Sequence, residues 1–144
     1  MLPRGHVIAS GIISICVWAY FKSIGCAAIS FASGVLLDAD HLIDYYANHG
    51  FTLNPKDVYD ACLEMRLNRL YIVLHSYEFI ALLWLAIFVF GLSNLWKAFA
   101  IGYTQHILFD QMTNPIRPLG YFITYRMAKG FKKELLLYQS KGVC

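Results

Sequence analysis

Residues 79–96 contain no charged side chain, the longest such run in this chain of 144 residues. A run of this length is typical of a helix that crosses a membrane, because the lipid core offers no partner for a charge. Charged residues make up 15% of the chain and apolar residues 58%, whereas a soluble domain carries about 25% charged residues. The sequence therefore indicates an integral membrane protein of one domain, residues 1–144.

Composition also excludes other classes of protein. The apolar content excludes a disordered chain. The four cysteines form no C-x-x-C pair, which argues against a disulfide framework and a zinc ribbon. The net charge of +3 is small, and no dense basic stripe occurs in the apolar two-thirds of the chain. We therefore expect no nucleic-acid partner.

The hydropathy pattern predicts an all-α membrane bundle of about four apolar helices, at 6–21, 23–43, 70–90 and 95–110. Between the second and third helices lies a polar loop, in which Asn54-Pro55 predicts the start of an amphipathic helix with Val58, Ala61, Cys62 and Met65 on one face. The tail, 111–144, carries Arg126, Lys129, Lys132 and Lys133. We expect it to lie against anionic lipid head groups, and a plainly solvated tail is the alternative.

Four spans would place ten Arg and Lys residues on the side of the termini and the 38–70 loop, and only Lys22 and Lys97 on the other. Positive charge accumulates on the cytoplasmic side. The bias predicts a multi-pass protein of the plasma (inner) membrane with cytoplasmic termini.

Eight ionisable side chains interrupt the apolar segments, where such groups are costly and usually functional. In an up-down-up-down bundle all eight would gather at the cytoplasmic end. They are His6, Asp38, Asp40, His41, His75, Glu78, His106 and Asp110.

The spacing of these groups predicts a metal site. His106 and Asp110 are four residues apart and share a helix face, and Asp38 and His41 are three apart. Helical bundles build metal sites from such pairs, and imidazole with carboxylate suits Zn, Mn, Fe or Ni, as one or two ions. The alternatives are separate structural roles: hydrogen-bonded core histidines, aspartates at helix ends, and Glu78 paired with Arg66 or Arg69.

Several blocks of the sequence resemble a known family. They are Gly5-His6, Leu37-Asp-Ala-Asp-His41, Leu74-His-Ser76, Gly102-Tyr-Thr-Gln-His-Ile-Leu-Phe-Asp110 and Met112-Thr-Asn-Pro115. Over roughly residues 5–125 the chain is similar to the YdjM-type inner-membrane metal-dependent hydrolases, also described as LexA-binding. That family is distantly similar to zinc-dependent phospholipases C. The resemblance implies a metal-ligand set of His6, Asp38, Asp40, His41, His75, His106 and Asp110.

One block departs from the family pattern. The family shows His-Arg-x-x-Thr-His-Ser before the third apolar helix, and here those His, Arg and Thr positions are Leu70, Tyr71 and Leu74. The departure allows a different metal count, a different substrate, or no catalysis.

The first functional hypothesis is a membrane-bound hydrolase in which a metal ion activates water against a phosphoester or other ester of an amphiphilic substrate. Glu78 or Asp38 would be the general base, and zinc is the expected metal. Membrane lipid and a small amphiphile are the expected partners. The alternative is a non-catalytic metal-binding membrane protein that acts as a sensor or docks a cytoplasmic protein partner. An ion or proton pathway is weaker, because the far end of the bundle offers only Lys22, Lys97 and small hydroxyls.

Overall fold

The computed structural model describes residues 3–52, 54–63 and 67–138, and over these residues the chain is helical with no β-strand. The expected all-α fold class is confirmed to that extent. In chain order the longer helices are α1 (Pro3–Phe21), α2 (Ile24–Leu36), α3 (His41–His49), α4 (Pro55–Leu63), α5 (Tyr77–Val89) and α6 (Asn94–Thr113). Short elements are η1 (Leu37–Asp40), η2 (Pro118–Tyr121), α7 (Ile123–Ala128) and α8 (Lys133–Leu136).

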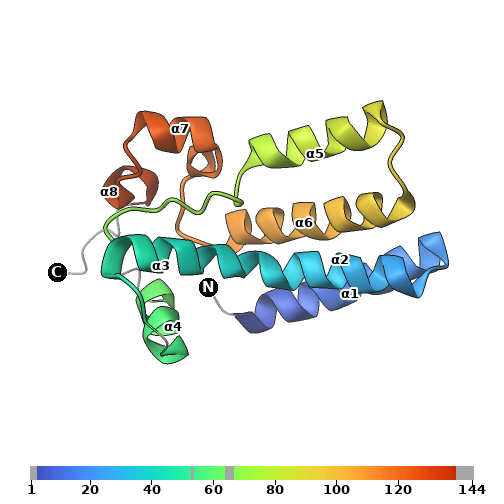
Figure 1. Ribbon diagram of the computed structural model, residues 1–144, viewed down its shortest axis with the longest axis horizontal. Coiled ribbons are helices and arrows are strands. Elements are labelled where there is room, and N and C mark those ends of the chain that lie inside the picture. The colour runs from blue at the N-terminus through green and yellow to red at the C-terminus, as the bar shows by residue number, and fades with distance from the viewer. Residues whose placement is uncertain (1–2, 53, 64–66, 139–144) are drawn as a thin grey trace.

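Helices α1, α2 and α6 pack together as the core of the molecule, and α5 lies on the outer side of α6 (Figure 1). Small residues allow α2 and α6 to approach closely: a Cβ on Gly102 would collide with the Ser30 carbonyl oxygen. Across the same contact Ser33 Oγ donates to the Phe99 carbonyl at 3.0 Å. Close approach through glycine and serine is typical of helix pairs in membranes.

Two helical stretches, Arg4–Phe21 and Ile24–His49, are long and apolar enough to cross a membrane. The second combines α2, η1 and α3, which run on as one rod in Figure 1. Only 22% and 28% of these windows are buried inside the protein, so most of their apolar side chains face outward. This differs from the core helix of a soluble protein, which hides its apolar side chains.

The third apolar segment is shorter than the sequence predicts. A helix over 70–90 was expected, but α5 begins only at Tyr77, where Ser76 caps it by accepting from Phe79 N–H. The residues before it form a partly buried loop. Apart from short-range bonds such as His75 N–H to the Ile72 carbonyl, its backbone bonds to side chains of other elements, including Asp44 and Arg126. With 13 residues, α5 is about 20 Å long, which is less than the roughly 30 Å of a bilayer core.

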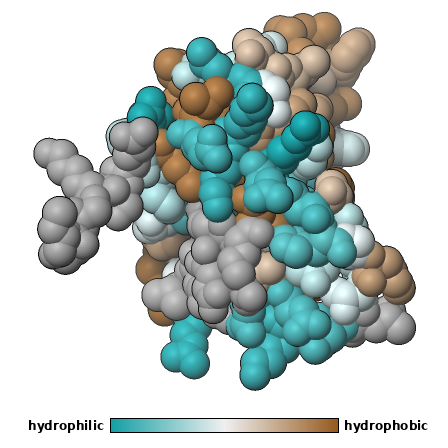
Figure 2. Space-filling view, turned by 90° about the vertical axis from the view of Figure 1, so that its left-hand side faces the viewer, coloured by the Kyte–Doolittle hydropathy of each residue, from teal (hydrophilic) through white to brown (hydrophobic). Residues whose placement is uncertain are grey.

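The chain after α6 folds back onto the bundle. Isolated bridges join Arg69 to Lys132 and Ile116 to Leu137. Arg126 is fully buried, so the expectation that it contacts lipid head groups is wrong, whereas Lys129 and Lys132 are exposed. Hydrophilic side chains gather over much of this end of the molecule (Figure 2). Met65 and the last part of the predicted tail, 139–144, lie outside the described residues.

Candidate metal centre

The structure brings together side chains from four separate parts of the chain at the end of the bundle that carries α3 and α7. His6 comes from α1, Asp38 and Asp40 from η1, and His106 and Asp110 from α6. Two further members are His41, the first residue of α3, and His75, in the loop before α5. All seven residues of the predicted ligand set therefore lie in one region.

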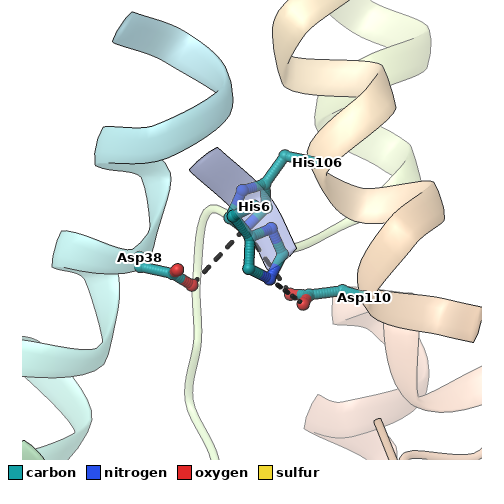
Figure 3. Close-up of side chains that lie close together, drawn as sticks. All are labelled: His6, Asp38, His106 and Asp110. Atoms are coloured by element: carbon teal, nitrogen blue, oxygen red, sulfur yellow. Dashed lines mark ion pairs between the residues drawn. The ribbon is translucent and has the colours of Figure 1, made fainter. Parts of the chain in front are cut away.

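Four of these residues form a compact group that could hold a metal ion: His6, Asp38, His106 and Asp110 (Figure 3). Each offers one ligand atom, and those atoms lie within 4.8 Å of one another. His6 Nε2 is 3.0 Å from Asp110 Oδ1, and its ring stacks on that of His106 with centroids 4.2 Å apart. Asp38 Oδ1 approaches His106 Nε2 to 3.4 Å from the opposite side.

A second group consists of Asp38, His41 and His75, and it shares Asp38 with the first. His41 Nε2 is 3.6 Å from Asp38 Oδ1, and His75 Nε2 is 3.8 Å from the same oxygen. Asp110 Oδ2 also lies 3.3 Å from His75 Nε2. Carboxylates therefore connect the two groups.

The two central imidazoles face each other with their ligand nitrogens. His75 Nε2 and His106 Nε2 are 3.1 Å apart. His106 Nδ1 lies 2.8 Å from the Gly34 carbonyl oxygen, which can only accept a hydrogen bond. His75 Nδ1 lies 3.2 Å from a carboxylate oxygen of Asp40. These partners assign the proton to Nδ1 of each ring, so both Nε2 lone pairs point into the space between them.

Two facing lone pairs and three nearby carboxylates require a positive charge. Asp38 Oδ1 and both carboxylate oxygens of Asp110 are buried, and imidazole nitrogens face them at 3.0–3.8 Å. His6 Nδ1 is buried and makes no hydrogen bond within the described part of the chain. Buried acceptors of this kind are costly unless a cation sits among them. Carbonyl and carboxylate partners behind metal-bound imidazoles are the usual outer shell of such sites. The residues therefore fit a divalent ion.

The pKa of His75 also indicates that this site favours a positive charge. Burial acts to lower the pKa of this imidazole, but its contacts with Asp110, Asp38 and Asp40 outweigh burial and raise the pKa to about 10. The pocket thus favours positive charge at His75 Nε2, which either a proton or a metal ion supplies. The two compete for the same lone pair.

Neighbouring groups keep their ordinary charge states. Burial raises the pKa of the Tyr121 hydroxyl, and Asp110 adds to the effect, so this buried phenol stays neutral. Burial lowers the pKa of Arg126, and the carboxylates of Asp44 and Asp40 oppose that change. Arginine begins from so high a pKa that the buried guanidinium remains a cation.

The centre has one open edge. Asp38 is 27% exposed and His41 is 15% exposed, whereas His6, His75, His106 and Asp110 are buried. The exposed parts of these two side chains lie at η1 and the start of α3, whereas the atoms Asp38 Oδ1 and His41 Nε2 are themselves buried.

Glu78 belongs to neither group of candidate ligands among the described residues. Its Oε2 accepts from the backbone N–H of Ile123, and its Oε1 accepts from the N–H and hydroxyl of Thr124, all at 2.8–3.0 Å. The carboxylate thus caps the start of α7, which gives Glu78 a structural role in place of the expected base. Arg69 bonds Tyr71, and Arg66 lies outside the described residues.

Sequence reasoning missed two buried charges beside the centre, Asp44 and Arg126. Asp44 was detectable, because it follows Asp40 by four residues and so shares its helix face. Arg126 carried no signal in the sequence that separates it from the exposed lysines after it.

Comparisons with protein-family models, curated proteins and solved structures give no match to this chain.

Proposed function

We propose that this chain is a membrane-bound, metal-dependent hydrolase of the YdjM type that acts on an ester, above all a phosphoester, of an amphiphilic substrate. The observation that carries the proposal is the pair of facing Nε2 atoms of His75 and His106, 3.1 Å apart, with carboxylates on either side. Imidazole nitrogens and carboxylate oxygens this close together could hold a metal ion.

Exposed apolar side chains support a place in the membrane. Along α1 and α2 they include Ile8, Ile12, Ile15, Ile24 and Leu36, each more than half exposed. Soluble proteins seldom expose contiguous apolar faces of this extent. We place the protein in the inner membrane as a multi-pass chain, with the centre and the described C-terminal segment on the cytoplasmic side because the basic residues gather there. Helix α5 would cross only with local thinning of the bilayer.

An amphiphilic substrate fits the surroundings of the centre. A mostly apolar cavity of about 250 Å³ lies between η1, α2 and α6. Leu36, Leu37, Phe99 and Asp40 are among the residues that line it. An alkyl chain in this cavity would lie near Asp40, whose carboxylate contacts the candidate ligand His75.

Some residues of the centre would bind the metal ion, and one would transfer a proton. His6, His106 and Asp110 would hold one ion, and His75 with His41 would complete the site or hold a second. A bound divalent ion would lower the pKa of water toward about 7 and polarise a phosphoryl oxygen. Asp38 belongs to both ligand groups through Oδ1, and its other carboxylate oxygen would accept the proton of the attacking water. Asp40 orients the His75 ring.

Metal analysis and hydrolysis together test the proposal. Protein purified in detergent should contain zinc or another transition metal, and it should hydrolyse bis-p-nitrophenyl phosphate or phosphatidylcholine in mixed micelles. His106→Ala and Asp110→Ala should lose both properties. His49→Ala is the matched control, because His49 is exposed, stacks on Tyr45 and belongs to neither group of candidate ligands among the described residues.

Two results would count against the proposal in different ways. Wild-type protein without bound metal, or His106→Ala protein with unchanged metal content, rules out the centre. Wild-type protein that binds metal but hydrolyses neither substrate favours the alternative, a sensor or a factor that docks a cytoplasmic partner.

A further inference from the structure

The loop before α5 carries His75, and four of its seven residues, 70–76, are buried although it has no regular secondary structure. Leu70, Ile72, His75 and Ser76 are all at most 2% exposed. Irregular backbone in such a place needs a partner for every N–H and C=O group, whether it lies in a protein core or at membrane depth. The partners of this loop therefore determine where His75 sits.

Two aspartates of the α2–α3 rod bind the amide groups of the loop. Asp44 Oδ1 accepts from Tyr71 N–H at 2.8 Å and from Ile72 N–H at 2.9 Å. Asp40 Oδ2 accepts from Leu74 N–H at 2.8 Å. These bonds hold the loop from one side and bury negative charge against it.

The carbonyl groups of the loop bind mainly to one side chain of α7. Arg126 Nη1 donates to the carbonyls of Tyr71 and Ile72 at 2.8 and 2.6 Å, and Nη2 donates to the carbonyl of His75 itself at 3.0 Å. Tyr103 of α6 donates its hydroxyl to the carbonyl of Leu74. A planar guanidinium suits three acceptors in fixed directions, which an ammonium group cannot match.

The position of Arg126 is fixed in turn by α5. Glu78, in the first turn of α5, caps the N-terminus of α7, and Arg126 lies in the last turn of that short helix. The loop continues along the chain into α5, Glu78 of α5 accepts hydrogen bonds from the first residues of α7, and Arg126 of α7 donates hydrogen bonds back to the loop. The burial of Arg126 completes this closed arrangement.

We propose that Arg126 is a positioning residue of the metal centre: by binding the carbonyls of Tyr71, Ile72 and His75 it sets the place of the His75 imidazole. The inference rests on the proposed metal centre and adds the C-terminal segment to it. Metal ligands tolerate displacements of only a few tenths of an ångström. Removal of the guanidinium would release the backbone of a ligand residue, so the metal would lose His75 while keeping the other group.

Cobalt spectroscopy separates this role from a role in folding. Full-length protein in detergent is loaded with Co²⁺, and its visible absorption, its Co²⁺ affinity and its helical circular dichroism are recorded for wild type, Arg126→Lys, Arg126→Met and His75→Ala. Arg117→Met is the matched control, because Arg117 is an exposed arginine that also donates to a backbone carbonyl, that of Leu137.

We expect Arg126→Lys to keep the helical signal, to bind Co²⁺ about 10-fold more weakly, and to show the spectrum of His75→Ala. Arg117→Met should match wild type. An Arg126→Lys protein with wild-type spectrum and affinity would overturn the inference, as would one that loses its helical signal together with the metal. If Arg126→Met fails to fold, the spectrum and Co²⁺ affinity of Arg126→Lys still test the inference.

Failure of this inference differs visibly from failure of the proposed function. Wild-type protein that binds no Co²⁺ removes the metal centre altogether. If wild-type protein binds Co²⁺ but hydrolyses no ester, the Co²⁺ spectrum and affinity can still be measured. The role of Arg126 is then tested independently of catalysis.

Discussion

His75 and His106 direct their Nε2 atoms at each other across 3.1 Å, although 31 residues separate them in sequence. Each ring is held from behind, His75 by Asp40 and His106 by the Gly34 carbonyl. Neither ring can turn away without leaving a buried polar group unpaired, which costs about 1–3 kcal/mol. The pair is therefore held in the orientation that the proposed metal centre requires.

Asp40→Asn tests this preorganisation. His75 Nδ1 and Leu74 N–H both bond the same oxygen of Asp40. An amide oxygen there could still accept both bonds, but it lacks the negative charge that strengthens them, so the orientation of the imidazole is weakened. We expect zinc affinity to fall roughly 10- to 100-fold in a titration against a competing chelator. The control is Asp57→Asn, an exposed aspartate in the first turn of α4. Equal affinities in the two variants would mean that Asp40 does not orient His75.

Much of the centre was predictable from sequence because helical spacing determines which side chains share a face. His106 and Asp110 lie on one face of α6, and Asp38 and His41 lie where the α2–α3 rod passes the start of α1. That reasoning needs only helix geometry and the direction of each segment. It cannot find Arg126, whose contacts with the His75 loop span more than 50 residues.

The loop at 70–76 shows why the third helix was predicted too long. Its apolar side chains continue the hydropathy of α5, and Leu70 and Ile72 are indeed buried. The backbone, however, bonds to Asp44, Asp40 and Arg126. Hydropathy reports burial of side chains and says nothing about which groups satisfy the backbone.

Gly102→Ala should destabilise the contact between α2 and α6. A Cβ there would collide with the backbone carbonyl of Ser30, which cannot rotate away as a side chain could. We expect the variant to lose about 1–3 kcal/mol or more of unfolding free energy, measured by denaturant titration in detergent. Gly11→Ala is the matched control, because nothing lies within 4 Å of its added Cβ. A Gly102→Ala protein as stable as Gly11→Ala would show that the two helices are not in tight contact.

Ser76→Ala should weaken the start of α5. Ser76 is the N-cap and accepts from Phe79 N–H, and loss of such a cap costs about 1 kcal/mol. Ser93 is the N-cap residue of α6 but makes no side-chain cap bond, so Ser93→Ala should cost less. Thermal unfolding of the two variants checks the difference, and equal midpoints would rule out the cap at Ser76.

Asp38 belongs to both groups of candidate ligands, whereas His6 belongs to the first and His41 to the second. If each group holds an ion, Asp38→Ala should lower the zinc content per chain more than His6→Ala or His41→Ala does, because one carboxylate serves both ions. Elemental analysis after dialysis against a weak chelator measures the content. Zinc should also raise the unfolding temperature of wild type, since ligands that bind only the folded state stabilise it, and the rise should be smallest in Asp38→Ala. A zinc content of one ion in wild type, unchanged by His41→Ala, would restrict the centre to the group of His6, Asp38, His106 and Asp110.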